Sequence, residues 1–305
     1  MQYTKDDMAF LKNGRAQQHK STQLVTGKLC VVSGATSGVG LEAAKQLAKG
    51  GAMLVLVCRN KAKAEGVKAL LVKDYQAQVD IVVADFSLLS SVRNAAAIIL
   101  QRYAVIDVLI NSAGVHNTRR RLTQDGNELT FQVNHIAPFL FTMLLMDAIK
   151  KSGQGRVIQV NSEGHRFGGL NLSDLDWKKR PYIGLRAYGA SKTAQIMTVM
   201  TLADRLKGTG VTVNAMHPGG VRTNIGRNNG WLYRAWLRGV VWPFLKDPVI
   251  SGDALYYLAA APELENTTGR YFHLTIDEKP MLSALDETVR AAVWQRSLEL
   301  AGLYL

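Results

Sequence analysis

The stretch that decides the fold is residues 29–40, which read LCVVSGATSGVG. Apolar residues 29–32 lead into glycines spaced G-x-x-x-G-x-G, and a segment of helical character, 41–49, follows. A glycine turn between a strand and a helix lets the backbone approach a pyrophosphate and points the helix N-terminus at it. The pattern therefore predicts a dinucleotide site whose contacts include Gly34, Thr36, Ser37, Gly38, Val39 and Gly40.

Apolar runs and helical segments alternate along the rest of the chain. Further strands are expected at 53–58, 80–84, 105–110, 157–160 and 211–216, and helices near 61–74, 88–102, 129–150, 186–207 and 250–260. Strands that are apolar throughout are typical of parallel sheets covered by helices on both faces. Because no repeat or linker splits the chain, we predict one doubly wound α/β domain over residues 27–305. An N-terminal extension, residues 1–26, is expected to pack loosely against this domain or to cap it.

The composition is that of an ordinary globular chain. Of its 305 residues, 47% are hydrophobic and 20% charged, which excludes a disordered protein. No uninterrupted apolar run reaches the length of about 18 residues that a spanning helix needs, and the polar start MQYTKDD does not resemble a secretion signal. Cys30 and Cys58 lie in apolar runs and are expected to be buried free thiols. We therefore expect a cytoplasmic protein.

The end of the second expected strand bears on which cofactor is bound. An acidic residue at this point holds the ribose hydroxyls of NAD in folds of this kind, whereas here Arg59 stands there, with Lys61 and Lys63 after it. A guanidinium suits a 2′-phosphate, so NADP(H) is favoured over NAD(H). The alternative is a solvated charge cluster at the start of a helix. Further cofactor contacts are expected where the third and fourth strands end, at Asp85, Phe86, Asn111, Ala113 and Gly114.

A pair of reactive side chains begins the helix expected near 186–207. Tyr188 and Lys192 are four residues apart, so the phenol and the ammonium share one helix face. A nearby Lys⁺ and an oxidised nicotinamide would stabilise the phenolate and lower the pKa of Tyr188 from its usual value of about 10. Ser162, at the end of the fifth strand, can hydrogen-bond the same substrate oxygen. Taken alone, such a Tyr-x-x-x-Lys pair is usually only a helix face.

Together these motifs identify a family. The chain resembles the short-chain dehydrogenase/reductase superfamily over roughly residues 27–275 and, within it, the retinol dehydrogenase-like branch. The residues that carry the superfamily resemblance are 34–40, 111–114, Asn134, Ser162, Tyr188 with Lys192, and Pro218-Gly219. Those that carry the resemblance to the branch are 206–219, 262–272 and the ending from Trp294 to Leu303.

The resemblance implies a Rossmann-type fold with a mostly parallel seven-stranded sheet and assigns roles to individual residues. Tyr188 would be the general acid/base and Ser162 the donor to the substrate oxygen, while Lys192 would bind the nicotinamide ribose and tune Tyr188. Asn134 would hold a water that relays the proton. Further cofactor contacts are implied at Pro218, Gly219, Val221 and Thr223. Two positions depart from the family pattern: Ser33 stands where Thr is usual, and Ser112 where Asn is usual.

The net charge of +13 is concentrated in one aromatic segment. Between Arg205 and Lys246 there are seven basic residues and no acidic one, and three of the five tryptophans, Trp231, Trp236 and Trp242, fall in this stretch. In the family, the segment of about 220–250 covers the substrate, so a lid is expected. Residues 226–246 could also contact an anionic membrane surface. No nucleic-acid-binding module is present, so we expect no nucleic-acid partner.

We therefore predict an NADP(H)-dependent oxidoreductase that transfers a hydride between nicotinamide and the carbonyl or alcohol of a hydrophobic small molecule. One alternative is reduction of a carbon–carbon double bond, as in the related protochlorophyllide reductases. Another is a cofactor-sensing protein without turnover. The six histidines show no metal-binding spacing, so no metal is predicted, and His165 is expected either to line the pocket or to be structural. A homo-oligomer is compatible with the sequence.

Overall fold

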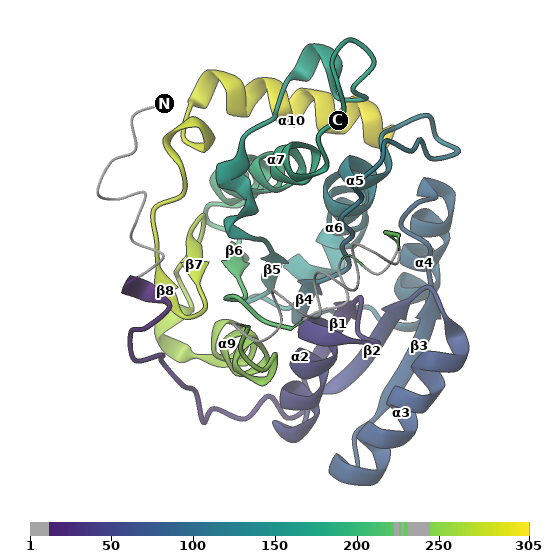
Figure 1. The fold of residues 1–305 in the computed structure, drawn as a ribbon. Coiled ribbons are helices and arrows are strands. Elements are labelled where there is room, and N and C mark those ends of the chain that lie inside the picture. The colour runs from purple at the N-terminus through teal and green to yellow at the C-terminus, as the bar shows by residue number, and fades with distance from the viewer. Residues whose placement is uncertain (1–11, 223–225, 227–228, 231–244, 305) are drawn as a thin grey trace.

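A single sheet of short, buried strands forms the centre of the computed structural model, which describes residues 12–222, 226, 229, 230 and 245–304. The strand order is β3-β2-β1-β4-β5-β6-β7-β8 (Figure 1). Strands β1 to β7 are parallel and β8 pairs antiparallel with β7. The strands are β1 (Leu29–Ser33), β2 (Met53–Cys58), β3 (Val79–Val83), β4 (Val108–Asn111), β5 (Arg156–Val160), β6 (Thr212–His217), β7 (Tyr271–His273) and β8 (Ile276–Asp277).

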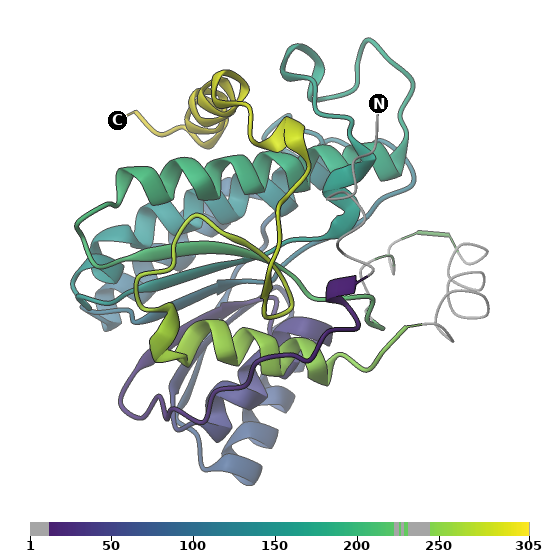
Figure 2. The same ribbon diagram turned by 90° about the vertical axis from the view of Figure 1, so that its left-hand side faces the viewer.

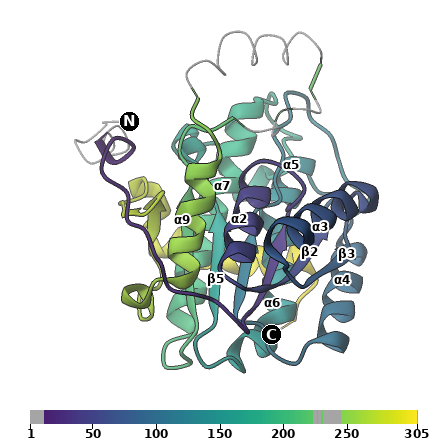
Figure 3. The same cartoon turned by 90° about the horizontal axis from the view of Figure 1, so that it is seen from below.

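Helices cover both faces of the sheet, as Figures 2 and 3 show. One face carries α4 (Leu89–Arg102), α6 (Ala137–Lys150) and α7 (Gly184–Arg205), with α10 (Glu287–Ala301) packed on α6 and α7. The other face carries α2 (Gly38–Lys49), α3 (Lys61–Tyr75) and α9 (Val249–Ala260). Two apolar cores therefore form, one on each face, and both faces of β1 are fully covered.

The predicted doubly wound α/β class is confirmed, with small differences in the elements. The sheet has eight strands, one more than predicted, because the pair β7–β8 adds an antiparallel edge. Strand β4 begins at Val108, later than the expected 105–110, because the chain from Tyr103 to Asp107 is still the connection from α4. The expected helix 129–150 is continuous but changes its pitch in the middle: α5 (Leu129–Phe131), a π-helical turn (Gln132–Ile136), then α6.

The strand order creates the crevice in which such folds bind ligands. The chain moves outward from β1 in one direction to β3 and then in the other direction from β4, so β1 and β4 are neighbours whose connections diverge. Their register sets Ser33 beside Asn111 at the carboxyl ends. The glycine turn that follows Ser33 and the loop that follows Asn111 therefore face each other across this crevice.

The described part of the N-terminal extension lies against the C-terminal third of the chain. The Asn13 amide donates to Glu278 over 2.8 Å, and the backbone N–H of His19 donates to Thr275 Oγ1 over 2.8 Å. The His19 ring stacks on Tyr257 at 5.5 Å between centroids. Residues 8–11 of the extension, whose sequence MAFL is helical in character, lie outside the described residues. We refer to residues 12–25 as the N-terminal strap.

Two expectations from composition can be compared with the structure. Cys30 and Cys58 are buried and free, as predicted, and burial raises the pKa of both thiols. One helical run in the described part of the chain, Leu129–Lys150, is long and apolar enough to span a membrane. However, 83% of its most apolar stretch of 18 residues is buried inside the protein. That burial is typical of a core helix.

Candidate active site

A cavity of about 1080 Å³ opens at the carboxyl ends of the central strands. It brings together most of the site residues that the sequence predicts, although they are spread over almost 190 positions. Those that line it are Gly34, Thr36, Ser37, Gly38, Val39, Arg59, Asp85, Phe86, Ala113, Gly114, Ser162, Tyr188, Lys192, Pro218, Gly219 and Val221. Gly40, Asn111 and Asn134 do not line it, and Thr223 lies outside the described residues.

The glycine turn after β1 packs too closely against neighbouring backbone to accept side chains at Gly34 and Gly40. Gly34 has a φ of +71°, and a Cβ on it would lie 2.7 Å from the backbone nitrogen of Ala113. Gly40 does not line the cavity, but a Cβ there would lie 2.6 Å from the carbonyl oxygen of Gly34. Gly40 therefore allows α2 to pack against the turn rather than contacting a ligand directly.

The N-terminus of α2 faces the same cavity. Ser37 occupies the N-cap position but makes no capping hydrogen bond, so its hydroxyl and the first N–H groups of the helix are available to an anion. Ser33, one of the two departures from the family pattern, is fully buried. Its hydroxyl accepts from the N–H groups of Ser112 and Ala113 at 3.2 and 3.3 Å. It thereby joins the glycine turn to the loop after β4.

The far end of the cavity is basic. Arg59, Asn60 and Lys63 line it, whereas Lys61 is exposed and does not. Asn60 caps α3 by accepting from the N–H of Lys63 at 2.9 Å, so a second helix N-terminus begins here. Asp85 and Ser87, after β3, line the same cavity, and the Asp85 carboxylate accepts from the N–H and the hydroxyl of Ser87 at 2.9 and 2.7 Å. These residues fit the phosphate and adenosine part of a dinucleotide.

Tyr188, Ser162 and Lys192 meet at the other end of the cavity. The Ser162 hydroxyl accepts from the N–H of Gly164 at 3.0 Å and hydrogen-bonds the Tyr188 phenol. Lys192 Nζ lies 5.8 Å from the centroid of the Tyr188 ring and donates to the carbonyl oxygen of Val160 over 2.8 Å. The i, i+4 spacing on α7 therefore places the two side chains on one face, as the sequence predicts.

Burial decides the protonation of this pair. It raises the pKa of Tyr188 to about 12, with the Ser162 hydrogen bond acting in the opposite direction. It lowers the pKa of Lys192 to about 7. Tyr188 is therefore a phenol at pH 7 and is ready to donate a proton. The lowering of the Tyr188 pKa that the sequence argument expects needs an oxidised nicotinamide beside the phenol as well as Lys192, and it stays a prediction.

Asn134 is fully buried in the π-helical turn between α5 and α6. Its side chain is bonded to the loop after β4, accepting from the N–H of Val115 at 2.8 Å and donating to its carbonyl oxygen at 3.0 Å. The amide also donates to Ser191 Oγ at 3.1 Å. Asn134 thus fixes the backbone of Val115, which lines the cavity, without lining the cavity itself. π-helical turns of this kind occur often at functional sites.

His165 is structural, which was one of its two expected roles. It is fully buried, and its Nδ1 lies 2.9 Å from the carbonyl oxygen of Ser162, while Nε2 accepts from the N–H of Met281 at 3.1 Å. Both ring nitrogens are used, which holds the turn that carries Ser162.

Three other side chains gather beside the site at a place that sequence spacing does not reveal. Metal-ligating atoms of Glu163, His217 and His273 all lie within 4.8 Å of one another. The Glu163 carboxylate is already engaged, since it accepts from Arg166 Nε at 2.6 Å and from the Tyr271 hydroxyl at 2.8 Å. The absence of a resident metal stays a prediction.

Several cavity residues were missed from the sequence. Asn161 follows β5 and His217 ends β6, positions that could have marked them, whereas the sequence showed no signal at Phe167 or Arg121. Other missed lining residues are Val57, Cys58, Ala84, Ser87, Val115, Leu129, Val133, Val160, Gly220 and Leu245. Most of the expected lid, residues 226–246, lies outside the described residues.

Comparison with known proteins agrees with this arrangement. The family model for short chain dehydrogenases matches residues 28–230. Human retinol dehydrogenase 13 is 37% identical over 295 residues, which cover 95% of this chain and 88% of that protein. Human WW domain-containing oxidoreductase is 37% identical over 89% of this chain and 67% of its own length.

Solved structures share the fold. A putative uncharacterized protein from Mycobacterium paratuberculosis superposes with a TM-score of 0.74 and 28% identity, over 94% of this chain and 98% of that one. A putative short chain dehydrogenase from Escherichia coli, complexed with NADPH, superposes with a TM-score of 0.67 and 25% identity, over 83% of this chain and 99% of that one. The chain belongs to the short-chain dehydrogenase/reductase family, in its retinol dehydrogenase-like branch.

Proposed function

We propose that this protein is an NADP(H)-dependent oxidoreductase that transfers a hydride between nicotinamide and the carbonyl or alcohol of a hydrophobic substrate. The observation that carries the proposal is the single cavity that joins the glycine turn at one end to Tyr188 and Lys192 at the other. Its volume of about 1080 Å³ suits a dinucleotide together with part of a substrate. NADPH, when bound, supplies the hydride.

The side chains supply the proton and the orientation. Ser162 is placed to donate a hydrogen bond to the substrate oxygen. Tyr188 protonates that oxygen as negative charge develops on it during reduction, acting as general acid. With its pKa raised to about 12 by burial, the phenol carries its proton at neutral pH, as a general acid must. In the oxidative direction the same residue accepts the proton.

A hydrophobic substrate is supported by the apolar part of the cavity wall. Phe167, beside the turn that carries Ser162, lines the cavity and is 51% exposed, which is unusual for so large an apolar side chain unless it contacts a ligand. Val115, Leu129 and Val133 add apolar surface. The names of the related retinol dehydrogenases point to the same class of substrate.

The choice of NADP(H) rests on Arg59. Replacing Arg59 with Asp is expected to weaken NADPH binding by about 10- to 100-fold, because a charge-assisted contact to the 2′-phosphate is lost, and to improve NADH binding. Titration of both cofactors, followed by quenching of tryptophan fluorescence, measures the change. Lys73→Asp makes the same charge change on an exposed turn of α3 away from the cavity and is expected to leave both affinities unchanged. Wild-type protein that binds NADH as tightly as NADPH would contradict the assignment.

Two alternatives differ in substrate or in turnover, and one assay separates them. The alternatives are a carbon–carbon double-bond reductase and a cofactor-sensing protein. Purified protein with NADPH is offered aldehydes, ketones and enones, and loss of NADPH absorbance is followed with product analysis. Reduction of apolar aldehydes or ketones supports the proposal. Reduction of the enone double bond alone favours the first alternative, and cofactor binding without any turnover favours the second.

For residues 226–246 we propose a substrate lid that also touches membranes, on the strength of their three tryptophans and basic charge. Changing Trp236 and Trp242 together to Ala is expected to raise KM for large apolar substrates more than for small ones, with NADPH affinity unchanged. Wild-type protein is expected to float with anionic liposomes at low salt, and the double variant to float less. Equal KM changes for all substrate sizes argue against the lid, and wild-type protein left entirely at the bottom argues against membrane contact.

A further inference from the structure

Behind the cavity, a chain of buried polar side chains runs from Lys192 into the core, and Gln195 is its centre. Gln195 lies on α7 one turn after Lys192 and is 3% exposed. Its Oε1 accepts from Asn161 Nδ2 at 2.8 Å and from Lys192 Nζ at 3.4 Å. Its Nε2 donates to the backbone carbonyl of Asn134 at 3.1 Å and to Gln159 Oε1 at 3.2 Å. One amide thus contacts two of the four predicted catalytic residues directly.

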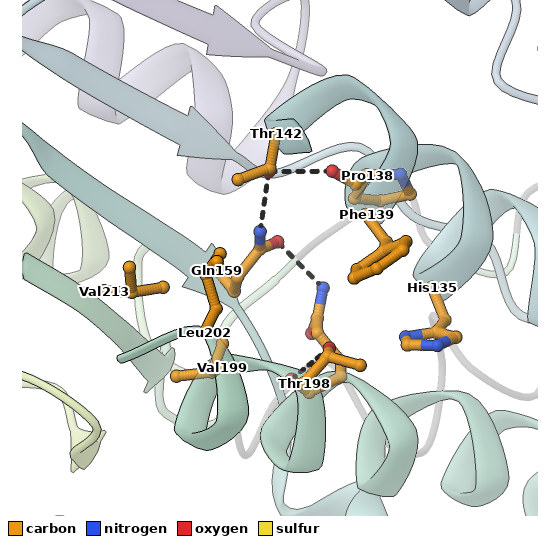
Figure 4. Close-up of a pocket in the computed structure, with 10 residues that line it drawn as sticks. His135, Pro138, Phe139, Thr142, Gln159, Thr198, Val199, Leu202 and Val213 are labelled. Carbon is orange, nitrogen blue, oxygen red and sulfur yellow. Dashed lines mark hydrogen bonds between the residues drawn. The ribbon is translucent and has the colours of Figure 1, made fainter. Parts of the chain in front are cut away.

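The network continues beyond Gln195 to the middle of the sheet, as Figure 4 shows for Gln159 and Thr142. Gln159 Nε2 donates to Thr142 Oγ1 at 3.2 Å, and Thr142 in turn donates to the carbonyl of Pro138 at 2.8 Å. Asn111 Nδ2 also donates to Thr142 Oγ1, over 2.9 Å. The residues belong to β4, β5, α6 and α7, so the amide of Gln195 is fixed by four elements of the fold.

The orientation of this amide follows from its neighbours. The N–H of Ser162 donates to Asn161 Oδ1 at 2.8 Å, so Asn161 must present its Nδ2 to Gln195. Gln195 must then present Oε1 to Asn161, and the same oxygen faces Lys192. If the Gln195 amide were flipped, its NH₂ group would face the NH₂ group of Asn161 and the ammonium of Lys192. Its oxygen would face the oxygens of Asn134 and Gln159, and all four hydrogen bonds would be lost. The oxygen and the nitrogen of the Gln195 amide are therefore both matched in only one orientation.

Lys192 depends on this oxygen because it has few other partners. It is 3% exposed, and within the described part of the chain its Nζ has one further acceptor, the backbone carbonyl of Val160. The titratable groups that face it are neutral at pH 7. They are Tyr188, at 5.8 Å, and His135 of the π-helical turn, whose pKa is lowered to about 3 by burial and by Lys192. The ammonium therefore has no charged partner and relies on two neutral oxygens.

We propose that Gln195 is a positioning residue for the hydride transfer proposed above: its side-chain amide holds the Lys192 ammonium and ties it to the Asn134 turn. The effect of Gln195 on hydride transfer rests on the proposed function, whereas its contact with Lys192 does not. It requires that Gln195 favour the charged form of Lys192, since a hydrogen bond to the charged form stabilises that form. Gln195 does not line the cavity, so it acts on the reaction only through Lys192 and the Asn134 turn.

The test is a titration of Lys192 in the full chain. Protein labelled with [¹⁵N]lysine is followed by NMR across pH, with the Lys192 signal assigned by its loss in Lys192→Met. In Gln195→Met, which keeps the side-chain length but removes the acceptor, the midpoint of Lys192 is expected to fall by about one pH unit. Gln159→Met, which disturbs the same network without touching Lys192, is the matched control and is expected to leave the midpoint nearly unchanged.

A second variant and a second readout keep the result decisive. If Gln195→Met does not fold, Gln195→Asn withdraws the amide oxygen by one methylene and is expected to move the midpoint in the same direction. In alcohol oxidation, the acidic limb of kcat/KM is expected to move to higher pH, because a less charged Lys192 stabilises the Tyr188 phenolate less. An unchanged midpoint in both Gln195 variants, or an equal shift in Gln159→Met, overturns the proposal. If the wild-type protein turns over no substrate, the proposed function fails, while the titration still decides whether Gln195 holds Lys192.

Discussion

Replacing Tyr188 with phenylalanine is expected to lower kcat by about 10²- to 10⁴-fold, because general acid catalysis by one side chain contributes that much. Tyr188 is the one phenol lining the described cavity, and its burial keeps it protonated near pH 7. The measurement is the steady-state rate of NADPH oxidation with the best substrate from the carbonyl series. NADPH affinity, followed by fluorescence, is expected to stay close to wild type.

A matched change separates loss of the proton donor from loss of any hydroxyl. Tyr256→Phe removes a hydroxyl that donates to the carbonyl oxygen of Gln23 at 2.7 Å, outside the cavity. We expect it to cost stability slightly and to leave kcat unchanged. Should Tyr188→Phe retain most of its turnover, Tyr188 is not the general acid.

The second large effect is expected at Gly34. In Gly34→Ala the backbone must hold a φ of +71° with a side chain, and the new Cβ meets the backbone nitrogen of Ala113 at 2.7 Å. The left-handed conformation costs about 1–2 kcal/mol and the overpacking about 1–3 kcal/mol, so a loss of about 2–5 kcal/mol in the free energy of unfolding follows. Urea denaturation measures the loss. NADPH affinity is expected to fall as well, because the turn must shift.

Gly66 provides the control for this change. It lies inside α3, and nothing stands within 4 Å of where its Cβ would be. Gly66→Ala is expected to raise the free energy of unfolding by about 0.5–1 kcal/mol, since alanine is the better helix former. A Gly34→Ala protein as stable as wild type would show that the turn relaxes freely and that it does not require glycine.

The features that could be predicted from the sequence are those encoded locally. The turn at Gly34 and the Tyr188–Lys192 pair are each visible within a few residues, because a strand–turn–helix junction and an i, i+4 spacing are short patterns. The alternation of apolar runs with helical segments then implies a parallel sheet covered by helices on both faces.

What could not be predicted depends on which strands become neighbours. Asn161 and Gln195 are ordinary polar residues in the sequence. Gln195 follows Lys192 by one turn of α7, but only the packing of α7 beside the end of β5 brings Asn161 to the Gln195 amide. Asn134 does not line the cavity, because its side chain is used to bind the backbone of Val115. Strand β8 consists of two residues, too few for any alternation to be recognised.

The contacts of the N-terminal strap have a consequence for how the protein is made. Asn13 bonds to Glu278 across 265 positions of sequence, and the N–H of His19 bonds to Thr275 across 256. During synthesis Asn13 and His19 of the strap leave the ribosome long before these binding partners do. The part of the strap around Asn13 and His19 therefore stays undocked until these partners have been synthesised, and its polar residues, such as Gln17, Gln18 and Lys20, are suited to contact with water in the meantime. Docking of this part of the strap beside β7 and β8 accordingly follows the synthesis of the inner strands, and a ribosome that stalls before residue 275 leaves it without its partners.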